Sequence, residues 1–276
     1  MNSKGCTNEK NGIYLYSNKI AASIETRTRL EEKLVKSGYP VHSSLQEDTE
    51  LVIVIGGDGT LLEAIHQFEF PDVPFIGINT GHLGFFQELM PSQLDDFIFN
   101  YGQNSFSIQE LSTVEINVNS NGLISTHMGL NEIVVKSSDN HSIHLNMSIG
   151  GSFIQRFSGD GVIIATPAGS TAYNYSLGGS IVDPRVNVLQ LTPIAPMNTI
   201  AYRSFTSSIL LPPQLELGII PDGRSSEKPL RIIFDGYCQN YSTVDSIKVS
   251  MGRKKVKLLR FDNYDFWTKV KSKFLL

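Results

Sequence analysis

Cysteine is scarce in this chain, because its 276 residues include only Cys6 and Cys238. Two cysteines are too few for a disulfide framework or a zinc site. Long apolar runs are missing as well: nowhere do about 18 apolar residues follow one another, as a membrane span requires. The polar start, MNSKGCTNEKNG, has no apolar signal core. We therefore expect a cytoplasmic protein without a membrane partner.

Charge is low and nearly balanced. Charged residues make up 18% of the chain, and the formal net charge is −4. This balance gives no reason to expect a nucleic-acid partner. Apolar residues make up 41%, which suits a soluble globular protein and argues against disorder. The length allows two domains or one large one, with a sizeable core.

A carboxylate inside a glycine turn is the most informative feature. The turn Gly56-Gly57-Asp58-Gly59-Thr60 directly follows the apolar run 51–55, and a helical pattern begins at residue 61. Five aliphatic residues in a row predict a strand covered on both faces, as in a parallel sheet. The turn then lies at the carboxyl end of a strand, where open α/β sheets bind ligands. The N–H groups of the helix start there attract phosphate.

Two interpretations of Asp58 compete. It caps the helix, which is a common use of aspartate, or it takes part in chemistry. A bare phosphate cradle gains nothing from a carboxylate at its centre, and no Gly-Lys-Ser/Thr follows to make a Walker-type loop. We therefore interpret Asp58 as a reactant or a metal partner.

The pattern of the chain changes near residue 105. Before it, strands and helices alternate; after it, short β segments follow one another. We expect an α/β domain with a parallel sheet at 1–105, a β-rich domain at 106–261, and a tail at 262–276 that packs on the first domain. The helix expected at 20–36 carries Ile20, Ile24, Leu34 and Val35 on one face. The other predicted elements are strands at 13–16, 51–55, 73–78, 113–119, 130–135, 143–149, 162–165, 216–220, 230–234, 247–250 and 256–261, a helix after the glycine turn, and helices near 94–101 and 264–274.

A second glycine-rich segment covers residues 159–173. Asp160 precedes an apolar strand that ends in a Pro-Ala-Gly turn. Ser170 and Thr171 are expected to cap a short helix carrying Tyr173, so that hydroxyl and N–H groups converge at the helix start. The alternative is an ordinary capped helix without a ligand. The presence of the first motif favours a binding role.

The pair Asn131-Glu132 opens another apolar strand. Its side chains offer a hydrogen-bond donor and acceptor suited to ribose hydroxyls or a base edge. By itself, such a pair is more often a solvated turn.

Five segments belong together, and in combination they resemble the NAD kinase family over most of the chain. The glycine motif alone is shared with diacylglycerol, sphingosine and 6-phosphofructo-kinases, whereas the stretch from 166 to 176 is specific to NAD kinases. The segments are GGDGTLLEA at 56–64, PFIGINTGHLGF at 74–85, LNEIVV at 130–135, GDGVIIATPAGSTAYNYSLGG at 159–179 and FDG at 234–236.

The resemblance implies an enzyme that transfers the γ-phosphoryl of ATP to the 2′-hydroxyl of the adenosine ribose of NAD, giving NADP. Its partners are then NAD and ATP, and the protein forms a homodimer or a homotetramer. By motif match, Asp58 accepts the proton of the 2′-hydroxyl, Gly59 lies beside it, and Asn131 and Glu132 contact the dinucleotide. The other implied substrate contacts are Phe85, Ser158, Asp160, Thr171, Ala172, Tyr173, Asn174, Tyr175, Ser176, Ala195 and Tyr237.

The chemistry of Asp58 follows from its weakness as a base. A carboxylate cannot ionise an alcohol in advance, so Asp58 orients the nucleophile and takes the proton late, as the new bond forms. The charge on the phosphoryl oxygens needs a counter-charge, and no Walker lysine is present. We expect Mg²⁺, or another divalent metal, to arrive with ATP, and no metal site of the protein's own.

Three positions depart from the commoner family pattern. Ser158 stands where many members carry a basic residue, Met197 replaces a histidine, and Tyr237 replaces an amide or histidine. We expect altered affinity and intact chemistry. Two rival functions remain: a lipid kinase with the same glycine motif, and a non-catalytic dinucleotide-binding protein. The second has no need for Asp58.

Overall fold

The computed structural model describes residues 12–82, 84–139, 141–223, 228–262 and 264–276. The chain divides into two compact units. The first contains the chain up to Glu110 together with Val256–Leu276, and the second contains Leu111–Lys255. The division thus falls five residues after the expected boundary at 105, and the chain re-enters the first unit six residues before 262. No helix in the described part is long and apolar enough to cross a membrane.

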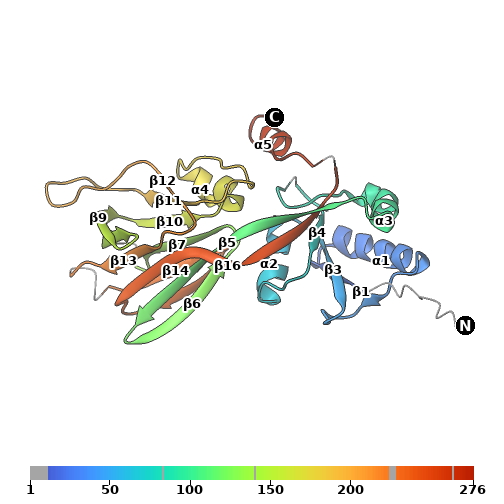
Figure 1. Ribbon diagram of the computed structural model, residues 1–276, viewed down its shortest axis with the longest axis horizontal. Coiled ribbons are helices and arrows are strands. Elements are labelled where there is room, and N and C mark those ends of the chain that lie inside the picture. Colours follow the sequence, from blue (N-terminus) through green and yellow to red (C-terminus); the bar gives the residue numbers. More distant parts are fainter. Residues whose placement is uncertain (1–11, 83, 140, 224–227, 263) are drawn as a thin grey trace, which may run out of the picture. The chain divides into compact units, whose positions relative to one another are not determined.

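The first unit contains a parallel sheet, as predicted (Figure 1). Its strands lie in the order β2, β1, β3, β4 and the end of β16, and each neighbouring pair is parallel. The inner strand β3 is buried along nearly its whole length, which explains its continuous apolar run. The bounds are β1 (Gly12–Ser17), β2 (Val41–His42), β3 (Thr49–Ile55), β4 (Phe75–Ile78) and β16 (Ser246–Arg260).

Helices complete this unit. Helices α1 and α3 lie side by side and are linked by an ion pair between Lys33 and Asp95. The core includes Leu30, Ile53 and Phe97, all fully buried. The bounds are α1 (Ala21–Lys36), α2 (Asp58–Gln67), the short 3₁₀ helix η1 (Pro91–Gln93), α3 (Leu94–Gly102) and α5 (Phe266–Phe274).

The predicted face of α1 is wrong. Ile20, Ile24 and Val35 are exposed, Ile20 by 62%. Only Leu34 of the predicted face is buried. The other buried residues are Ser23, Thr26 and Leu30, and the four recur at the helical spacing of three and four. Two small hydroxyl residues can face inward because their oxygens are satisfied: Ser23 Oγ lies 2.7 Å from Thr80 Oγ1, and Thr26 donates to the carbonyl of Ala22.

The second unit contains two antiparallel sheets that share one core. One sheet has the order β16, β13, β8, β9, and the other β12, β11, β10, β7, β14, β15; β5 and β6 form a hairpin. Side chains from both sheets meet in the core, for example Leu145 from β8 and Ile164 from β10. The bounds are β5 (Ser107–Ser120), β6 (Leu123–Gly129), β7 (Glu132–Ser137), β8 (Ile143–Ile149), β9 (Ser152–Gly159), β10 (Gly161–Ala165), η2 (Ala168–Thr171), α4 (Tyr173–Ser176), β11 (Leu189–Ile194), β12 (Ile209–Leu211), β13 (Leu217–Pro221), β14 (Leu230–Phe234) and β15 (Tyr237–Tyr241).

Candidate active site

Asp58 is the first residue of α2, directly after the turn that follows β3. Its side chain is 25% exposed, so the carboxylate is reachable from solvent. Its neighbour Gly59 is exposed, and a Cβ atom built on that glycine would meet no atom within 4 Å. The start of α2 therefore presents a carboxylate beside open space.

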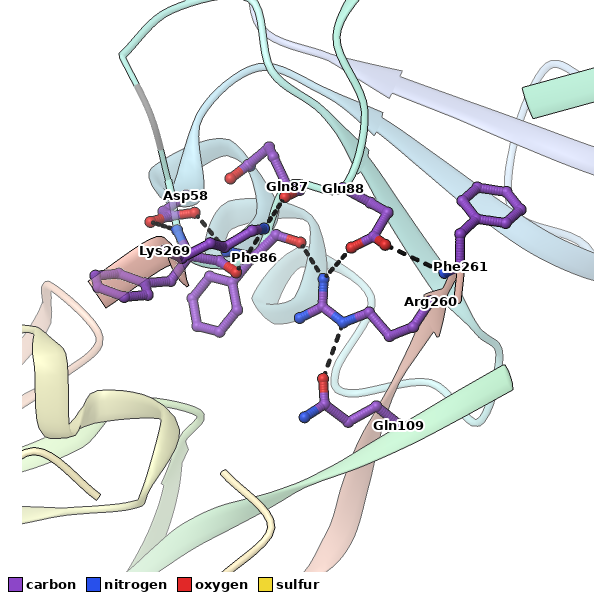
Figure 2. Close-up of polar contacts among 9 residues, drawn as sticks. Asp58, Phe86, Gln87, Glu88, Gln109, Arg260, Phe261 and Lys269 are labelled. Carbon is purple, nitrogen blue, oxygen red and sulfur yellow. Dashed lines mark hydrogen bonds and ion pairs between the residues drawn. The ribbon is translucent and has the colours of Figure 1, made fainter. Parts of the chain in front are cut away.

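The loop after β4 holds the Asp58 carboxylate (Figure 2). The backbone N–H of Phe85 donates to Oδ2 at 2.9 Å, and that of Phe86 donates to Oδ1 at 3.0 Å. The loop runs so close that a Cβ on Gly84 would lie 2.3 Å from Oδ1, a position that only glycine can occupy. The helix-cap interpretation is wrong: Gly57 is the N-cap, and α2 has no side-chain cap bond.

A buried ion pair fixes the same loop (Figure 2). Nη1 of Arg260 donates to the carbonyl of Phe86 at 3.0 Å and to the carboxylate of Glu88 at 2.9 Å, and Nε donates to Gln109 at 2.9 Å. The two paired side chains are 5% and 4% exposed. Loss of either partner would leave an unpaired charge in the interior.

Two lysines of α5 reach the same loop and carboxylate. Nζ of Lys269 donates to the carbonyl of Phe85 at 3.3 Å and to that of Gln87, and Nζ of Lys273 lies 3.8 Å from Oδ2 of Asp58. Burial lowers the pKa of Lys269 to about 8, and the nearby positive charge of Arg260 adds to this effect. No local sequence pattern predicts the role of these lysines, because the loop that Lys269 contacts lies 184 residues earlier in the chain.

The ring of Phe85, an expected substrate contact, packs against α5. It is buried and packs against two aromatic rings of α5, with centroids 6.0 Å from Phe266 and 5.8 Å from Phe274. The part of Phe85 that reaches Asp58 is the backbone N–H. A direct contact of Phe85 with substrate stays a prediction.

In the second unit, Asn131 and Glu132 lie where the chain enters β7. The carboxylate of Asp235 accepts hydrogen bonds from three successive N–H groups, those of Leu130 at 2.5 Å, Asn131 at 2.7 Å and Glu132 at 3.2 Å. This clamp fixes the backbone that carries the predicted dinucleotide contacts. Asp235 belongs to the FDG segment at 234–236, but its 104-residue separation from Asn131 hid the role.

The side chains of this pair carry unsatisfied atoms. Oδ1 of Asn131 and Oε2 of Glu132 are buried and have no hydrogen-bond partner among the described residues. Burial raises the pKa of Glu132 to about 8, and the charge of Asp235 adds to the shift. Since most buried polar atoms have partners, these two atoms suit a polar ligand.

The turn after β10 packs directly on Asn131. The N–H of Thr166 donates to the carbonyl of Asn131 at 2.9 Å, and the hydroxyl of Thr166 donates to the carbonyl of Leu130 at 2.6 Å. A Cβ on Gly169 would lie 2.0 Å from the carbonyl oxygen of Asn131. The structure thus brings the segment 159–173 and the pair Asn131-Glu132 together. The close approach also explains why residue 169 is a glycine, because a side chain there would collide with Asn131.

The predicted cap at Ser170 and Thr171 is wrong. Both residues belong to η2, and the N-cap of α4 is Ala172, without a side-chain cap bond. The hydroxyl of Ser170 is fully buried and already used: it donates to the carbonyl of Pro167 at 2.7 Å and accepts the N–H of Val182 at 3.0 Å.

Helix α4 presents a mixed surface. Tyr173, Tyr175 and Ser176 are exposed, Tyr173 by 44%, so Tyr173 is not a core residue. Asn174 is fully buried; its Oδ1 accepts the hydroxyl of Thr192 at 2.7 Å, while Nδ2 has no partner in the described part of the chain. The exposed ring of Tyr173 is therefore accessible for stacking.

The remaining predicted contacts are placed as follows. Ser158 is buried, and its N–H donates to the hydroxyl of Ser204 at 3.1 Å. Asp160 is exposed between β9 and β10, Ala195 has a positive φ of 44°, and the half-exposed ring of Tyr237 stacks on Phe234. All positions from Asn131 to Tyr237 lie in the second unit, whereas Asp58, Gly59 and Phe85 lie in the first.

Comparison with known proteins decides the family. Residues 14–101 match the model of the ATP-NAD kinase N-terminal domain, and residues 130–261 match that of the ATP-NAD kinase C-terminal domain. The chain belongs to the NAD kinase family. An NAD kinase of Finegoldia magna is 35% identical over 266 residues, 95% of this chain and 97% of the relative. An NAD kinase of Staphylococcus aureus is 34% identical over 233 residues, 83% of this chain and 86% of the relative.

Solved structures of NAD kinase family members have the same fold. The yeast NADH kinase complexed with NADH superimposes with a TM-score of 0.83 at 21% identity, covering 98% of this chain and 89% of that one. An NAD kinase from Archaeoglobus fulgidus in complex with ATP gives 0.74 at 22% identity, covering 94% and 98%. The predicted family and fold class are confirmed.

Proposed function

We propose that this protein is an NAD kinase that transfers the γ-phosphoryl of ATP to the 2′-hydroxyl of the adenosine ribose of NAD, giving NADP. The observation that carries the proposal is the 35% identity to the Finegoldia magna NAD kinase over nearly the full length of both chains. The arrangement around Asp58 and Asn131 agrees with it chemically.

Asp58 orients the 2′-hydroxyl and accepts its proton. Both carboxylate oxygens already accept one N–H bond, from Phe85 and Phe86, and each oxygen has a further lone pair for the alcohol. The two N–H groups fix the carboxylate, so it need not reorient during the reaction. The proton moves as the new oxygen–phosphorus bond forms, because only then does the hydroxyl become acidic enough.

Asn131 and Glu132 bind hydroxyl groups of NAD. With its pKa raised to about 8, the carboxyl of Glu132 is protonated at neutral pH and can donate a hydrogen bond. The free Oδ1 of Asn131 is an acceptor. Together they match a sugar hydroxyl, which both donates and accepts. Tyr173 offers its exposed ring for stacking on the dinucleotide.

The divalent cation enters as part of the ATP substrate. Among the described residues no group of three or more His, Cys, Asp or Glu side chains is arranged to hold a metal. Mg²⁺ that is bound to nucleotide phosphates needs only one or two protein carboxylates, which this chain can offer at Asp58. When bound, the cation neutralises charge on the phosphoryl oxygens.

The family resemblance also supports a cytoplasmic homodimer or homotetramer. Light scattering coupled to gel filtration gives the mass of the assembly directly.

The reaction itself is tested by incubating the purified protein with NAD, ATP and Mg²⁺ and assaying for NADP. NADP formation is expected only with all three present. Parallel reactions with NADH in place of NAD, and with polyphosphate in place of ATP, define the acceptor and the donor. The proposal would be contradicted if neither donor gave NADP from NAD or NADPH from NADH.

A further inference from the structure

Helix α5 brings two cations to the Asp58 site. Lys269 and Lys273 are four residues apart, so their side chains leave the same face of the helix. Lys269 contacts the loop carbonyls, and Lys273 lies beside the carboxylate, 3.8 Å from Oδ2. Neither contact follows from the glycine motif.

The contact of Lys269 continues through one peptide group to Asp58. In a planar trans peptide the C=O and the following N–H point in opposite directions. The carbonyl of Phe85, which accepts from Lys269, and the N–H of Phe86, which donates to Asp58 Oδ1, belong to the same peptide. A cation that fixes this oxygen on one side therefore aims the N–H on the other side. Polarisation of the peptide also strengthens that donor.

The neighbouring peptides are fixed in the same way (Figure 2). Lys269 also holds the carbonyl of Gln87, and Arg260 holds that of Phe86 between them. Three successive carbonyls thus bond to buried or partly buried cations. The loop that donates hydrogen bonds to Asp58 is therefore itself hydrogen-bonded by α5 and by the end of β16.

We propose that Lys269 is a positioning residue for the phosphoryl-transfer reaction: its ammonium group orients the peptide between Phe85 and Phe86, whose N–H fixes the Asp58 carboxylate in its reactive orientation. Lys273 places a second positive charge 3.8 Å from Oδ2 of the same carboxylate. This inference rests on the proposed role of Asp58 as proton acceptor.

Attachment of α5 to the first unit does not by itself explain the burial of the Lys269 charge. The apolar residues Phe266 and Val270 are already buried, and no ion pair of Lys269 with a carboxylate is found in the described residues. The ammonium group of Lys269 bonds two carbonyls and lies 5.0 Å from the centroid of the Tyr264 ring, and burying a charge without a directly paired carboxylate costs free energy. The two roles differ in what they predict for turnover and for substrate binding.

The test compares Lys269→Met, which keeps the length of the side chain and removes the charge, with Lys269→Arg, which restores a cationic donor. Lys271→Met is the matched control, since Lys271 is exposed on the same helix. Steady-state kinetics with NAD and Mg²⁺-ATP give kcat and both KM values, and thermal unfolding shows that each variant is folded at the assay temperature.

We expect Lys269→Met to lose about tenfold or more in kcat with both KM values within about twofold of wild type, as for loss of a group that orients a catalytic residue. Lys269→Arg should recover most of this loss, and Lys271→Met should match wild type. A folded Lys269→Met with wild-type kcat overturns the proposal. An Asp58→Asn variant run in parallel separates the two claims, because only its full activity would overturn the role of Asp58.

The pH dependence of kcat is a second test, and it does not depend on whether Lys269→Met folds. With saturating substrates, wild-type kcat should fall as pH rises through about 8, where Lys269 loses its charge, and in Lys269→Arg the fall should move to higher pH. A fall at the same pH in both proteins, or a wild-type profile without a fall, overturns the proposal. The charged and titratable groups around Lys269 are Asp58, Glu88, Arg260, Lys273 and Tyr264.

Discussion

At the scale of single residues, two carboxylates organise this protein by accepting backbone N–H groups from distant segments. Asp58 accepts from Phe85 and Phe86, and Asp235 accepts from three residues at 130–132. A carboxylate is well suited to this because it only accepts hydrogen bonds and charge strengthens them. The carboxylate of Asp58 is also partly exposed to solvent, so a substrate can reach it.

Asp58→Asn should separate chemistry from binding. The amide keeps one oxygen for the loop and turns an NH₂ group toward the other N–H donor, so a modest fall in melting temperature is expected. Loss of the proton acceptor should lower kcat by about 10²-fold or more, with the KM for NAD nearly unchanged. Steady-state kinetics on the folded variant measure kcat and KM. A near-normal kcat would contradict the role of Asp58 as proton acceptor.

The buried carboxyl of Glu132 makes stability depend on pH. Its pKa is about 8 in the folded protein and 4.5 as the ordinary value, so between these pH values the folded state binds more protons than the unfolded state. The free energy of unfolding therefore falls as pH rises through this window, and the loss is complete above about pH 8. Roughly 1 to 3 kcal/mol is expected, allowing for partial solvation.

Glu132→Gln removes this titration and keeps the shape of the side chain. Urea unfolding at about pH 5 and about pH 8.5 should show the variant gaining stability relative to wild type as pH rises. An equal difference between the two proteins at both pH values would mean that Glu132 does not titrate in this window.

The residue scale also shows what the sequence could not supply. The glycine turn, the apolar strand before it and the missing Walker lysine together pointed to Asp58 as a reactant. The groups that hold Asp58 lie 27 and 28 residues later in the chain, and Lys269 is farther still. A local pattern cannot reveal such partners, so the glycine turn by itself leaves helix capping as an alternative role for Asp58.

At the scale of elements, most strands with continuous or alternating apolar residues were predicted, and most polar strands were missed. The buried strand β11 and the apolar strand β12 are exceptions that were not predicted. The apolar strands β3, β7 and β10 lie close to their predicted ranges. The strands β6 and β15 were not predicted, because most of their side chains are exposed and give no alternation. The face of α1 was predicted wrongly because two hydroxyl residues with hydrogen-bond partners pack inward, Ser23 with the distant Thr80 and Thr26 with Ala22, and the isoleucines remain outside.

Helix α4 carries the prediction for Tyr173. Because the ring is 44% exposed, Tyr173→Ala should leave the melting temperature nearly unchanged. If the ring stacks on the dinucleotide, NAD affinity should fall roughly tenfold, in line with about 1 to 3 kcal/mol for base stacking. Tyr173→Phe keeps the aromatic face and should bind like wild type. Calorimetric titration with NAD decides, and a Tyr173→Ala protein with wild-type affinity would remove Tyr173 from the site.

At the scale of the whole molecule, ligand binding should appear as stability. A ligand that binds only the folded protein adds about 2.7 kcal/mol to the free energy of unfolding at a concentration of 100 times Kd. NAD should therefore raise the melting temperature, and a diacylglycerol or sphingosine in detergent should not. The opposite result would favour the lipid-kinase alternative.

The path of the chain through the two units has a consequence for biosynthesis. Strand β16 enters the first unit only at Val256, after the whole second unit has been made, and it is the strand that pairs with β4. Because synthesis runs from the N-terminus, β1 to β4 leave the ribosome long before β16 and α5. The second unit, continuous in sequence, can fold first. The Asp58 loop acquires Arg260 and Lys269 only at the end of translation, so a nascent chain that stalls before Val256 contains the glycine motif without its support.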